Sequence, residues 1–329
     1  MVLSGENIGT NTPKEVVLVT GATGFIGPYL VDILKSANRE VRVYSRQQYS
    51  GESVLSVPES NWFTGELTEI SSLDEACRGV DTVYHLAGMA HSLGSDRQDL
   101  MRVNVLGTKN LFGAAVKNGV KKFVYFSSIH SSSPELSAYA ESKREVERLL
   151  SSRNFDVSGM RIAVLRPATV YGVGMKGNLR TFVRLVLTGF LPLLPSFSST
   201  FRMVSVRDLC RVAIEVSQND YDDSRFVSYA VTDGELYTPN RIEEAVYSRT
   251  ERGKPRWRLP KVFFYLAAFL ADLANRLGVK KNRLGLQLYN NLADTRAEAE
   301  DMSGPSYVFA PTATLESEIG PIIESLNKR

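Results

Sequence analysis

The sequence predicts an α/β fold, a doubly wound parallel sheet with a smaller, mainly helical C-terminal lobe. Through the first half of the chain, short apolar runs rich in β-branched residues alternate with segments of helical periodicity. A glycine-rich stretch joins the first apolar run to the first helical segment. Alternation of this kind implies parallel strands joined by right-handed helical crossovers. After Gly172 the alternation loosens, and the last third is helical and more basic.

The expected elements follow one another in a regular order. Strands are expected at residues 15–20, 41–44, 82–87, 123–126 and 161–165, and helices at residues 25–37, 98–117 and 139–150. Thr238 followed by Pro239 has the pattern of a capping residue with proline at the first helical position, which predicts a helix that begins there.

The most apolar stretch of the chain, residues 262–271, is too short to span a bilayer, so no integral membrane segment is expected. We expect it to form a buried or interface helix. A helix that rests on a membrane is the alternative, supported by the basic Lys261 and Arg276 nearby.

The composition is that of an ordinary globular chain. Of the 329 residues, 43% are hydrophobic and 23% charged. The net charge of +3 is too small to argue for a nucleic-acid partner. Cys77 and Cys210 have the spacing of neither a disulfide framework nor a metal site, and the three histidines lack ligand spacing. We therefore expect no metal and a reducing, cytoplasmic location.

Residues 20–27, TGATGFIG, place Gly21, Gly24 and Gly27 at a strand-to-helix turn. The first glycine permits the tight turn, the second lets the backbone approach a pyrophosphate, and the third lets the helix lie close to the sheet. The N-terminus of that helix offers free N–H groups to phosphates. Because the strand precedes and the helix follows, this turn predicts a dinucleotide site of the Rossmann type.

The end of the second strand bears on which dinucleotide is bound. NAD sites usually carry an acidic residue there, which binds the adenosine ribose. Here the place is taken by Ser45, 18 residues past Gly27, and Arg46 follows. A guanidinium can pair with a 2′-phosphate, so NADP(H) is favoured and NAD(H) is the alternative. Arg46 could also stack on the adenine or face solvent.

Tyr139 and Lys143 lie four residues apart, on one face of the expected helix. A free tyrosine has a pKa near 10, but a nearby ammonium favours the phenolate and makes the group useful for proton transfer. Ser128, at the end of the preceding strand, could hydrogen-bond the same substrate oxygen. After a dinucleotide turn, this spacing indicates a proton-transfer group.

Taken together, the motifs resemble those of the extended short-chain dehydrogenase/reductases, in the NAD-dependent epimerase/dehydratase group. The matching segments are TGATGFIG at 20–27, HLAG at 85–88, NVLGT at 104–108, FSS at 126–128, YAESK at 139–143 and RPATVYG at 166–172. The resemblance implies that Ser128 orients the substrate oxygen and Tyr139 is the acid and base. It further implies that Lys143 holds the nicotinamide ribose and that Asn104 supports this lysine and a relay water.

The resemblance also implies a wider cofactor site. Three glycines, Ser45 and Arg46 are expected to belong to it. The further expected members are Thr23, Phe25, Ile26, Glu66, Leu67, Leu86, Ala87, Gly88, Tyr139, Lys143, Pro167 and Val170.

The expected substrate residues are less well matched. Sugar 4,6-dehydratases carry Thr-Asp-Glu where this chain has Ser128-Ile129-His130, so elimination of water is not expected. His130 could shuttle a proton or be a plain loop residue. Asn178 follows the pattern of the residue that contacts the sugar diphosphate in relatives. The arginine that usually binds that diphosphate falls on Phe201, with Arg202 one position on.

Three functional hypotheses follow from these residues. The first is an NADPH-dependent reductase of a 4-keto nucleotide sugar, with a reductase of a lipid-like or steroid-like ketone as a close variant. The second is an NAD-dependent nucleotide-sugar 4-epimerase, and the third is a non-catalytic dinucleotide-binding protein.

We also expect a particular organisation of the chain. Residues 14–172 should form the dinucleotide-binding domain, to which residues 201–235 return, and residues 173–200 and 236–329 the substrate lobe. A homodimer through the helices at 98–117 and 139–150 is implied by the resemblance.

Overall fold

The computed structural model describes most of the chain around one central sheet. The described residues are 14–51, 55–89, 96–133, 137–152, 159–189, 193–197, 199–218, 225–250, 254–276 and 306–327. Seven parallel strands pair in the order β3-β2-β1-β4-β5-β6-β9. This order, with two halves diverging from β1, is that of a doubly wound Rossmann fold and confirms the predicted fold class.

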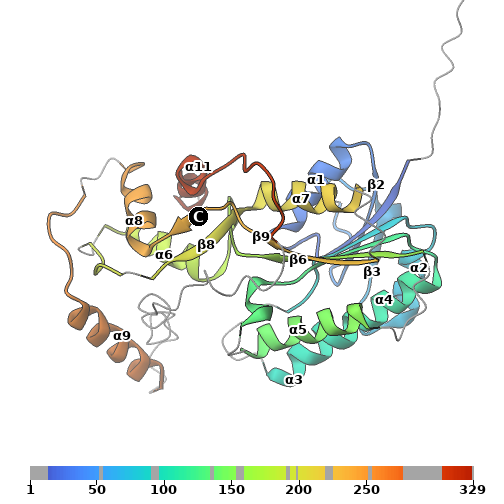
Figure 1. Ribbon diagram of the computed structural model, residues 1–329, viewed down its shortest axis with the longest axis horizontal. Coiled ribbons are helices and arrows are strands. Elements are labelled where there is room, and N and C mark those ends of the chain that lie inside the picture. The colour runs from blue at the N-terminus through green and yellow to red at the C-terminus, as the bar shows by residue number, and fades with distance from the viewer. Residues whose placement is uncertain are drawn as a thin grey trace, which may run out of the picture.

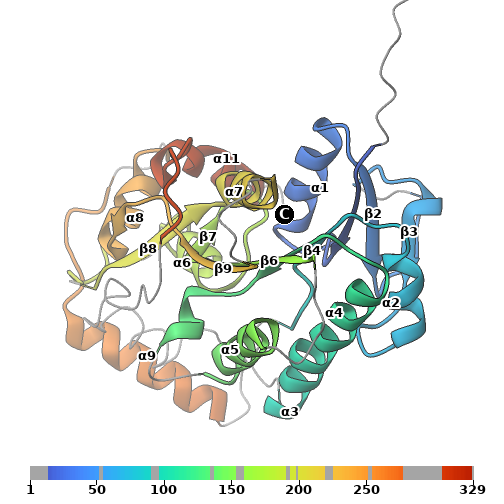
Figure 2. The same cartoon turned by 45° about the vertical axis from the view of Figure 1, so that its right-hand side comes forward.

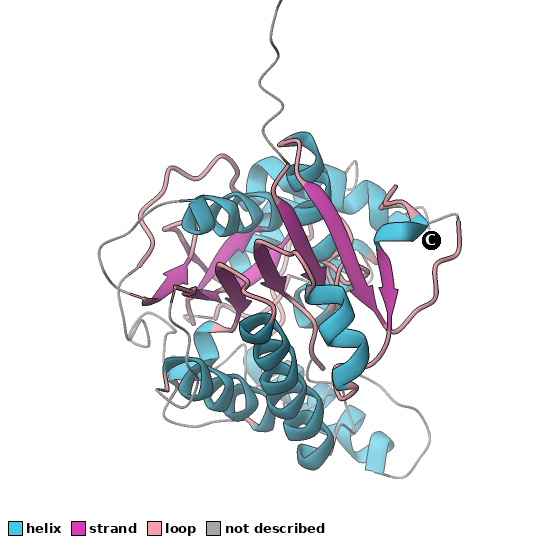
Figure 3. Ribbon diagram, turned by 90° about the vertical axis from the view of Figure 1, so that its right-hand side faces the viewer, coloured by secondary structure: helices cyan, strands magenta, loops and turns pink. Residues whose placement is uncertain are grey.

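Five strands of this sheet lie close to the predicted runs, whereas the two edge strands, β3 and β9, were not predicted. Their bounds are β1 Val16–Thr20, β2 Glu40–Ser45, β3 Trp62–Thr64, β4 Thr82–His85, β5 Lys122–Phe126, β6 Arg161–Pro167 and β9 Phe226–Val231. Helices cover both faces, so the central strands are buried along nearly their whole length instead of alternating between buried and exposed residues (Figure 3).

Two layers of helices enclose the sheet (Figures 1 and 2). Helices α1 (Gly27–Ser36) and α7 (Val206–Gln218) pack on one face. Helices α2 (Ile70–Cys77), α4 (Gly107–Lys117) and α5 (Ala138–Ser151) pack on the other. Each layer buries a hydrophobic core against the strands, which fixes the ends of β1, β4, β5 and β6 relative to the helices that follow them.

The predicted helix at 98–117 contains an irregular turn. It begins as α3 (Arg97–Leu100), passes through a π-helical segment, η2 (Met101–Leu106), and continues as α4. Single π-helical turns inside α-helices occur often at functional sites. Asn104 lies within this one and is buried.

A second, three-stranded sheet lies beyond the C-terminal edge of the first. It pairs β7 (Thr169–Tyr171) with β8 (Phe201–Ser205) in parallel and β8 with β10 (Leu236–Tyr237) antiparallel. The remaining helices there are α6 (Gly177–Leu187), α8 (Pro239–Tyr247) and α11 (Leu315–Asn327), which share a core with Tyr171 and Tyr237.

The predicted start of α8 is confirmed. Thr238 is the N-cap, and its hydroxyl accepts a hydrogen bond from the Arg241 amide at 3.1 Å. Pro239 occupies the first turn, where its missing N–H costs nothing.

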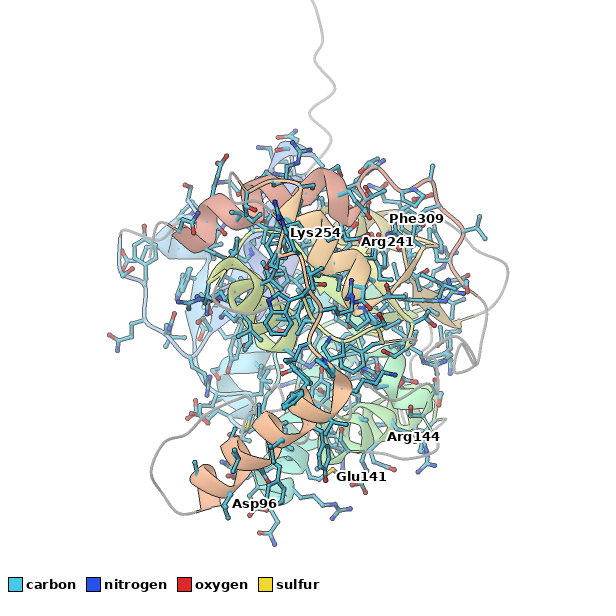
Figure 4. All side chains as sticks on the ribbon, turned by 90° about the vertical axis from the view of Figure 1, so that its left-hand side faces the viewer. Asp96, Glu141, Arg144, Arg241, Lys254 and Phe309 are labelled. Atoms are coloured by element: carbon cyan, nitrogen blue, oxygen red, sulfur yellow. The ribbon has the colours of Figure 1, made fainter. Side chains whose placement is uncertain are left out.

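The apolar stretch at 262–271 forms part of α9 (Lys261–Arg276), which is not a buried helix, so of the expected readings the interface helix and the helix resting on a membrane stay predictions. In Figure 4 the helix runs across the lower part of the view, below the labelled Arg241 and Lys254. Phe264 and Ala268 are its buried apolar side chains, whereas Val262 is 74% exposed and Leu270 54%. None of the helices in the described ranges is long and apolar enough to cross a membrane.

Candidate active site

The turn after β1 is shaped to bring backbone close to a ligand. Gly21 has φ of +74°, a left-handed conformation, and a Cβ built on it would lie 2.6 Å from the Ala87 nitrogen. A Cβ on Gly27 would lie 2.4 Å from the Ala22 Cα, so only glycine lets α1 begin this close to the turn. These contacts leave the turn free of side chains at the N-terminus of α1, which fits a dinucleotide pyrophosphate.

A cleft runs from this turn across the ends of the strands. Its lining includes many of the expected cofactor residues, namely Gly21, Thr23, Gly24, Ser45, Arg46, Glu66, Leu67, Leu86, Ala87 and Gly88. It also includes residues that the sequence did not single out for the cofactor, namely Tyr44, Gln47, Gly65, Thr68, Met89, Val103 and Lys176. Most of them are adjacent in the sequence to a predicted cofactor residue, and this adjacency was the only indication that the sequence offered.

The end of β2 presents a neutral and a basic residue to the cleft. Ser45 is buried, and its hydroxyl accepts a hydrogen bond from the Gln47 amide at 3.1 Å. Arg46 is exposed on the cleft wall. Glu66 also lines the cleft, and its backbone oxygen accepts a hydrogen bond from the Tyr44 hydroxyl at 2.9 Å.

Tyr139 lies in the first turn of α5. The Ser137 hydroxyl caps this helix by accepting a hydrogen bond from the Ala140 amide at 3.2 Å, which fixes where the turn begins. Burial of the phenol raises the pKa of Tyr139 to about 12. Tyr139 is therefore a protonated hydrogen-bond donor at neutral pH.

Lys143 follows one turn later and is 5% exposed. Its Nζ donates to the Phe126 carbonyl at 2.8 Å and lies 4.7 Å from the centre of the Tyr125 ring and 5.8 Å from that of Tyr139. Burial lowers the pKa of Lys143 to about 8, while the carboxylate of Glu147 acts in the opposite direction. The ammonium thus faces the tyrosine from inside the fold.

Ser128 stands just beyond β5 in an extended conformation and is the N-cap of the short helix η3 (Ile129–Ser132). Its hydroxyl accepts a hydrogen bond from the His130 amide at 3.3 Å. That leaves the Ser128 O–H free to donate elsewhere, as the predicted contact with a substrate oxygen requires.

Asn104 is held by three hydrogen bonds. Its Oδ1 accepts from the Met89 amide at 2.7 Å, and its Nδ2 donates to the Met89 carbonyl at 3.1 Å and to the Ser142 hydroxyl at 2.9 Å. A Cβ built on Gly88 would lie 3.0 Å from Asn104 Oδ1 and 3.9 Å from Lys143 Nζ. The cofactor cleft therefore opens beside Asn104 and Lys143, although the predicted relay role of Asn104 stays a prediction.

A buried histidine that the sequence analysis had not placed in the site joins the glycine turn to Asn104. His85 is fully buried, and its Nδ1 and Nε2 lie 2.7 Å from Thr20 Oγ1 and 2.8 Å from Thr108 Oγ1. Thr108 donates its single proton to the Asn104 carbonyl at 2.5 Å, so it must accept from His85 Nε2–H. Nδ1 then accepts from Thr20, whose oxygen accepts the Ala87 amide. Burial lowers the pKa of His85 to about 3, which keeps the ring neutral.

A second unpredicted group lies beneath α5. The Glu147 carboxylate accepts hydrogen bonds from Arg166, from Ser127, and from Ser131 at 2.7 Å. The sequence signal was available, because Glu147 continues the spacing of Tyr139 and Lys143 by another turn. Its partner Arg166 lies on β6, which spacing alone could not reveal.

The expected substrate residues lie on three different elements. His130 is exposed on η3, and Asn178 is exposed at the second position of α6. Arg202 lies on β8 and donates to the Gly234 carbonyl at 3.4 Å. Their roles toward a substrate stay predictions.

The other expected cofactor residues lie around the turn and beyond β6. Phe25 packs edge-on against Tyr29, with ring centres 6.4 Å apart. Pro167 is buried at the end of β6, and Val170 on β7 packs against the core under α1. Within the described part of the chain, no group of three or more His, Cys, Asp or Glu side chains could hold a metal ion.

Comparisons with known proteins agree with this geometry. The family model of the NAD dependent epimerase/dehydratase family matches residues 17–227. The chain is 28% identical to a UDP-glucose 4-epimerase from Vibrio cholerae over 271 residues, which covers 75% of this chain and 79% of that protein. It is 31% identical to a 3 beta-hydroxysteroid dehydrogenase/Delta 5-->4-isomerase from Mycobacterium tuberculosis over 201 residues, 54% of this chain and 53% of that protein.

A solved structure shares the fold across nearly the whole chain. The UDP-glucose 4-epimerase of Thermus thermophilus in complex with NAD superposes with a TM-score of 0.64 at 22% identity, covering 95% of this chain and 99% of that one. The match to the family model extends over well more than half of the chain. The chain therefore belongs to the NAD-dependent epimerase/dehydratase family and is a nicotinamide-dependent enzyme of the short-chain dehydrogenase/reductase type.

Proposed function

We propose that this enzyme reduces the 4-keto group of a nucleotide sugar with NADPH. The observation that carries the proposal is the end of β2, where Ser45 and Arg46 face the cleft and no carboxylate stands in the usual ribose-binding place. A carboxylate there would repel a 2′-phosphate, whereas a guanidinium can pair with one. NADPH that exchanges at each turnover is the cofactor of a reductase.

Tyr139 can supply the proton that such a reduction requires. Reduction of a ketone requires a proton for the oxygen that becomes a hydroxyl, and a tyrosine whose pKa is raised to about 12 holds that proton at neutral pH. The Ser128 hydroxyl can donate a second hydrogen bond to the same oxygen. Lys143 contributes a positive charge beside Tyr139 and a donor for a ribose hydroxyl. A bound reduced nicotinamide would supply the hydride.

Two other substrates or reactions have specific support. A nucleotide-sugar 4-epimerase with retained NAD would use the same Ser128, Tyr139 and Lys143, and the Vibrio cholerae relative is named for that activity. A lipid-like or steroid-like ketone is favoured by the steroid dehydrogenase relative, although the chain spans only about half of that protein.

The decisive experiment compares cofactors and reactions in the same preparation. We expect exchangeable NADPH to bind more tightly than NADH in fluorescence titrations and to be oxidised when a UDP-4-keto-6-deoxyhexose is added. Arg46→Ala should weaken NADPH binding by about tenfold and leave NADH binding almost unchanged. Co-purified NAD, with interconversion of UDP-glucose and UDP-galactose without added cofactor, would overturn the reductase proposal in favour of the epimerase.

Three expectations about organisation belong to the same proposal. The dinucleotide-binding domain would comprise residues 14–172 with 201–235, and the substrate lobe residues 173–200 and 236–329. The homodimer would form through η2, α4 and α5, and the enzyme would be cytoplasmic.

A further inference from the structure

Helix α9 presents its apolar side to the outside of the molecule. Val262, Leu266, Phe269 and Leu273 recur at helical spacing, so they form one stripe along the helix. They are 74%, 49%, 44% and 43% exposed, respectively. A stripe of this kind normally faces a core.

The side of α9 that touches the protein is narrow. Phe264 and Ala268 are buried there, and the Phe264 ring lies 5.8 Å from that of Phe197 in the core beneath α6 and α8. Asp272 is half-buried, and the cationic end of Lys261 lies 6.0 Å from the centre of the Phe197 ring. The helix is thus anchored mainly by Phe264 and Ala268 on a narrow inner face, and most of its other large side chains are exposed.

The approach to this helix is strongly basic. Residues 252–271 contain no acidic residue and five cations, namely Arg252, Lys254, Arg256, Arg258 and Lys261. Lys254 and Arg258 pair with acidic residues of α8, while Arg256 is exposed. Trp257 stands among these cations with 61% of its surface exposed.

We propose that α9 and residues 254–260 rest on the surface of an anionic lipid bilayer. An apolar helical face, flanking cations and an exposed tryptophan are the three features that hold a helix in the interface plane. Each cation near such a surface gains from the negative potential of the lipid headgroups. A second copy of this chain is disfavoured as the occupant, because a symmetric pairing would bring two of these basic segments together.

This attachment is separate from the proposed catalytic function. The cofactor cleft lies at the ends of β1, β2 and β4, and none of its lining residues belongs to α9. Cofactor titration therefore serves as the test of folding for every variant below, whatever substrate the enzyme takes.

Vesicle binding of the full-length protein tests the proposal. We expect the protein to sediment with vesicles of phosphatidylcholine containing about 30% phosphatidylglycerol, to bind phosphatidylcholine alone at least about tenfold more weakly, and to be released by high salt. Leu266→Gln combined with Phe269→Gln should lower binding by at least about tenfold, with NADPH titration unchanged. Ile70→Gln, at a residue 63% exposed on α2, is the matched control and should bind as the wild type does.

A second measurement locates the contact. The chain contains two tryptophans, so Trp62→Phe leaves Trp257 as the only indole reporter. Its emission should shift to shorter wavelength with the anionic vesicles, and Arg256→Gln should weaken binding while Arg78→Gln, elsewhere on the surface, should not.

Three results would overturn the proposal. Equal binding to both kinds of vesicle would show that the cations do not select an anionic surface. Absence of binding by a monomeric wild type would show that the exposed stripe has no affinity for an anionic bilayer. Absence of binding together with a dimer that the Leu266→Gln/Phe269→Gln variant abolishes would make α9 an interface between copies.

Discussion

The buried carboxylate of Glu147, one helical turn beyond Lys143, forms an ion pair with the partly buried guanidinium of Arg166. Arg166 Nε donates to Glu147 Oε2 at 3.0 Å, and a second guanidinium nitrogen donates to the same oxygen. Because Ser127 and Ser131 also donate to this carboxylate, Glu147 ties α5 both to β6 and to the segment that carries Ser128. The pair thus acts as a positioning element for the proton-transfer group.

Glu147→Gln should destabilise the enzyme strongly. The variant removes the negative charge that faces the Arg166 guanidinium and weakens the hydrogen bonds that Ser127 and Ser131 donate, in a site where the glutamate is 7% exposed, and such a loss costs about 3 kcal/mol. Urea unfolding measures this change. Glu145→Gln is the matched control, since Glu145 lies on the same helix in an exposed pair with Arg148 and should change stability by less than about 0.5 kcal/mol. Equal effects of the two variants would refute the structural role of Glu147.

Tyr139→Phe should lower kcat by about 10²- to 10⁴-fold, because it removes the proton donor and keeps the ring. Stopped-flow or steady-state turnover gives this number, and NADPH titration should show affinity close to that of the wild type. A variant that kept most of its turnover would show that another group supplies the proton.

Tyr125→Phe should stabilise the enzyme by about 1 kcal/mol. The Tyr125 hydroxyl is buried without a hydrogen-bond partner in the described part of the structure, and burial raises the pKa of this phenol well above its ordinary value. Removing an unsatisfied buried hydroxyl recovers its desolvation cost. The ring that lies against Lys143 is retained, so turnover should persist. A marked loss of stability in thermal unfolding would mean that the hydroxyl does have a partner in solution.

The central sheet could be predicted from the sequence because strand and helix periods alternate clearly there. Both edge strands were missed. Strand β3 (Trp62–Thr64) is only three residues long and half-exposed, and β9 (Phe226–Val231) lies in the part of the chain where the alternation has loosened. The cofactor turn could be placed because its glycines act within one short segment.

The buried partners of the site could not be predicted in this way. Which strands are neighbours in the sheet decides which of these side chains come into contact. This holds for the contact of Glu147 with Arg166 and for the contacts of His85 with Thr20 and Thr108. A buried or interface helix at residues 262–271 was predicted from apolarity alone. Whether an apolar helix is covered depends on a partner surface that the sequence of the helix does not contain.

Lys143→Met should make the protein more stable but inactive. Burial lowers the pKa of Lys143 from its ordinary value of 10.5 to about 8, so below pH 8 the folded state carries a costly buried ammonium. The pKa shift of Lys143 corresponds to a cost of about 3 kcal/mol in the free energy of unfolding. The variant removes this cost but also loses the hydrogen bond to the Phe126 carbonyl, so its net gain in stability should be about 2 kcal/mol. Between pH 8 and 10.5 only the unfolded state binds the proton, so wild-type stability rises and the advantage of the variant should shrink. Urea unfolding at pH 7 and pH 9.5 tests this prediction. A difference in unfolding free energy between variant and wild type that is the same at both pH values would contradict it.

The stability of the wild type should fall as the pH is lowered from 6.5, partly because of His85. Burial lowers the pKa of His85 from 6.5 to about 3, so between these values the unfolded chain binds a proton that the folded protein does not. Stability therefore rises with pH in this window, by about 1.4 kcal/mol per pH unit from this group alone. His85→Gln removes this contribution to the pH dependence. The difference in free energy of unfolding between wild type and variant should therefore narrow as the pH falls from 6.5 to 4.5. His130→Gln, on the exposed helix η3, is the control and should keep the wild-type slope. Parallel curves for wild type and His85→Gln would mean that the buried ring accepts a proton in the folded state, and the neutral chain from Thr20 to Asn104 would then be wrong.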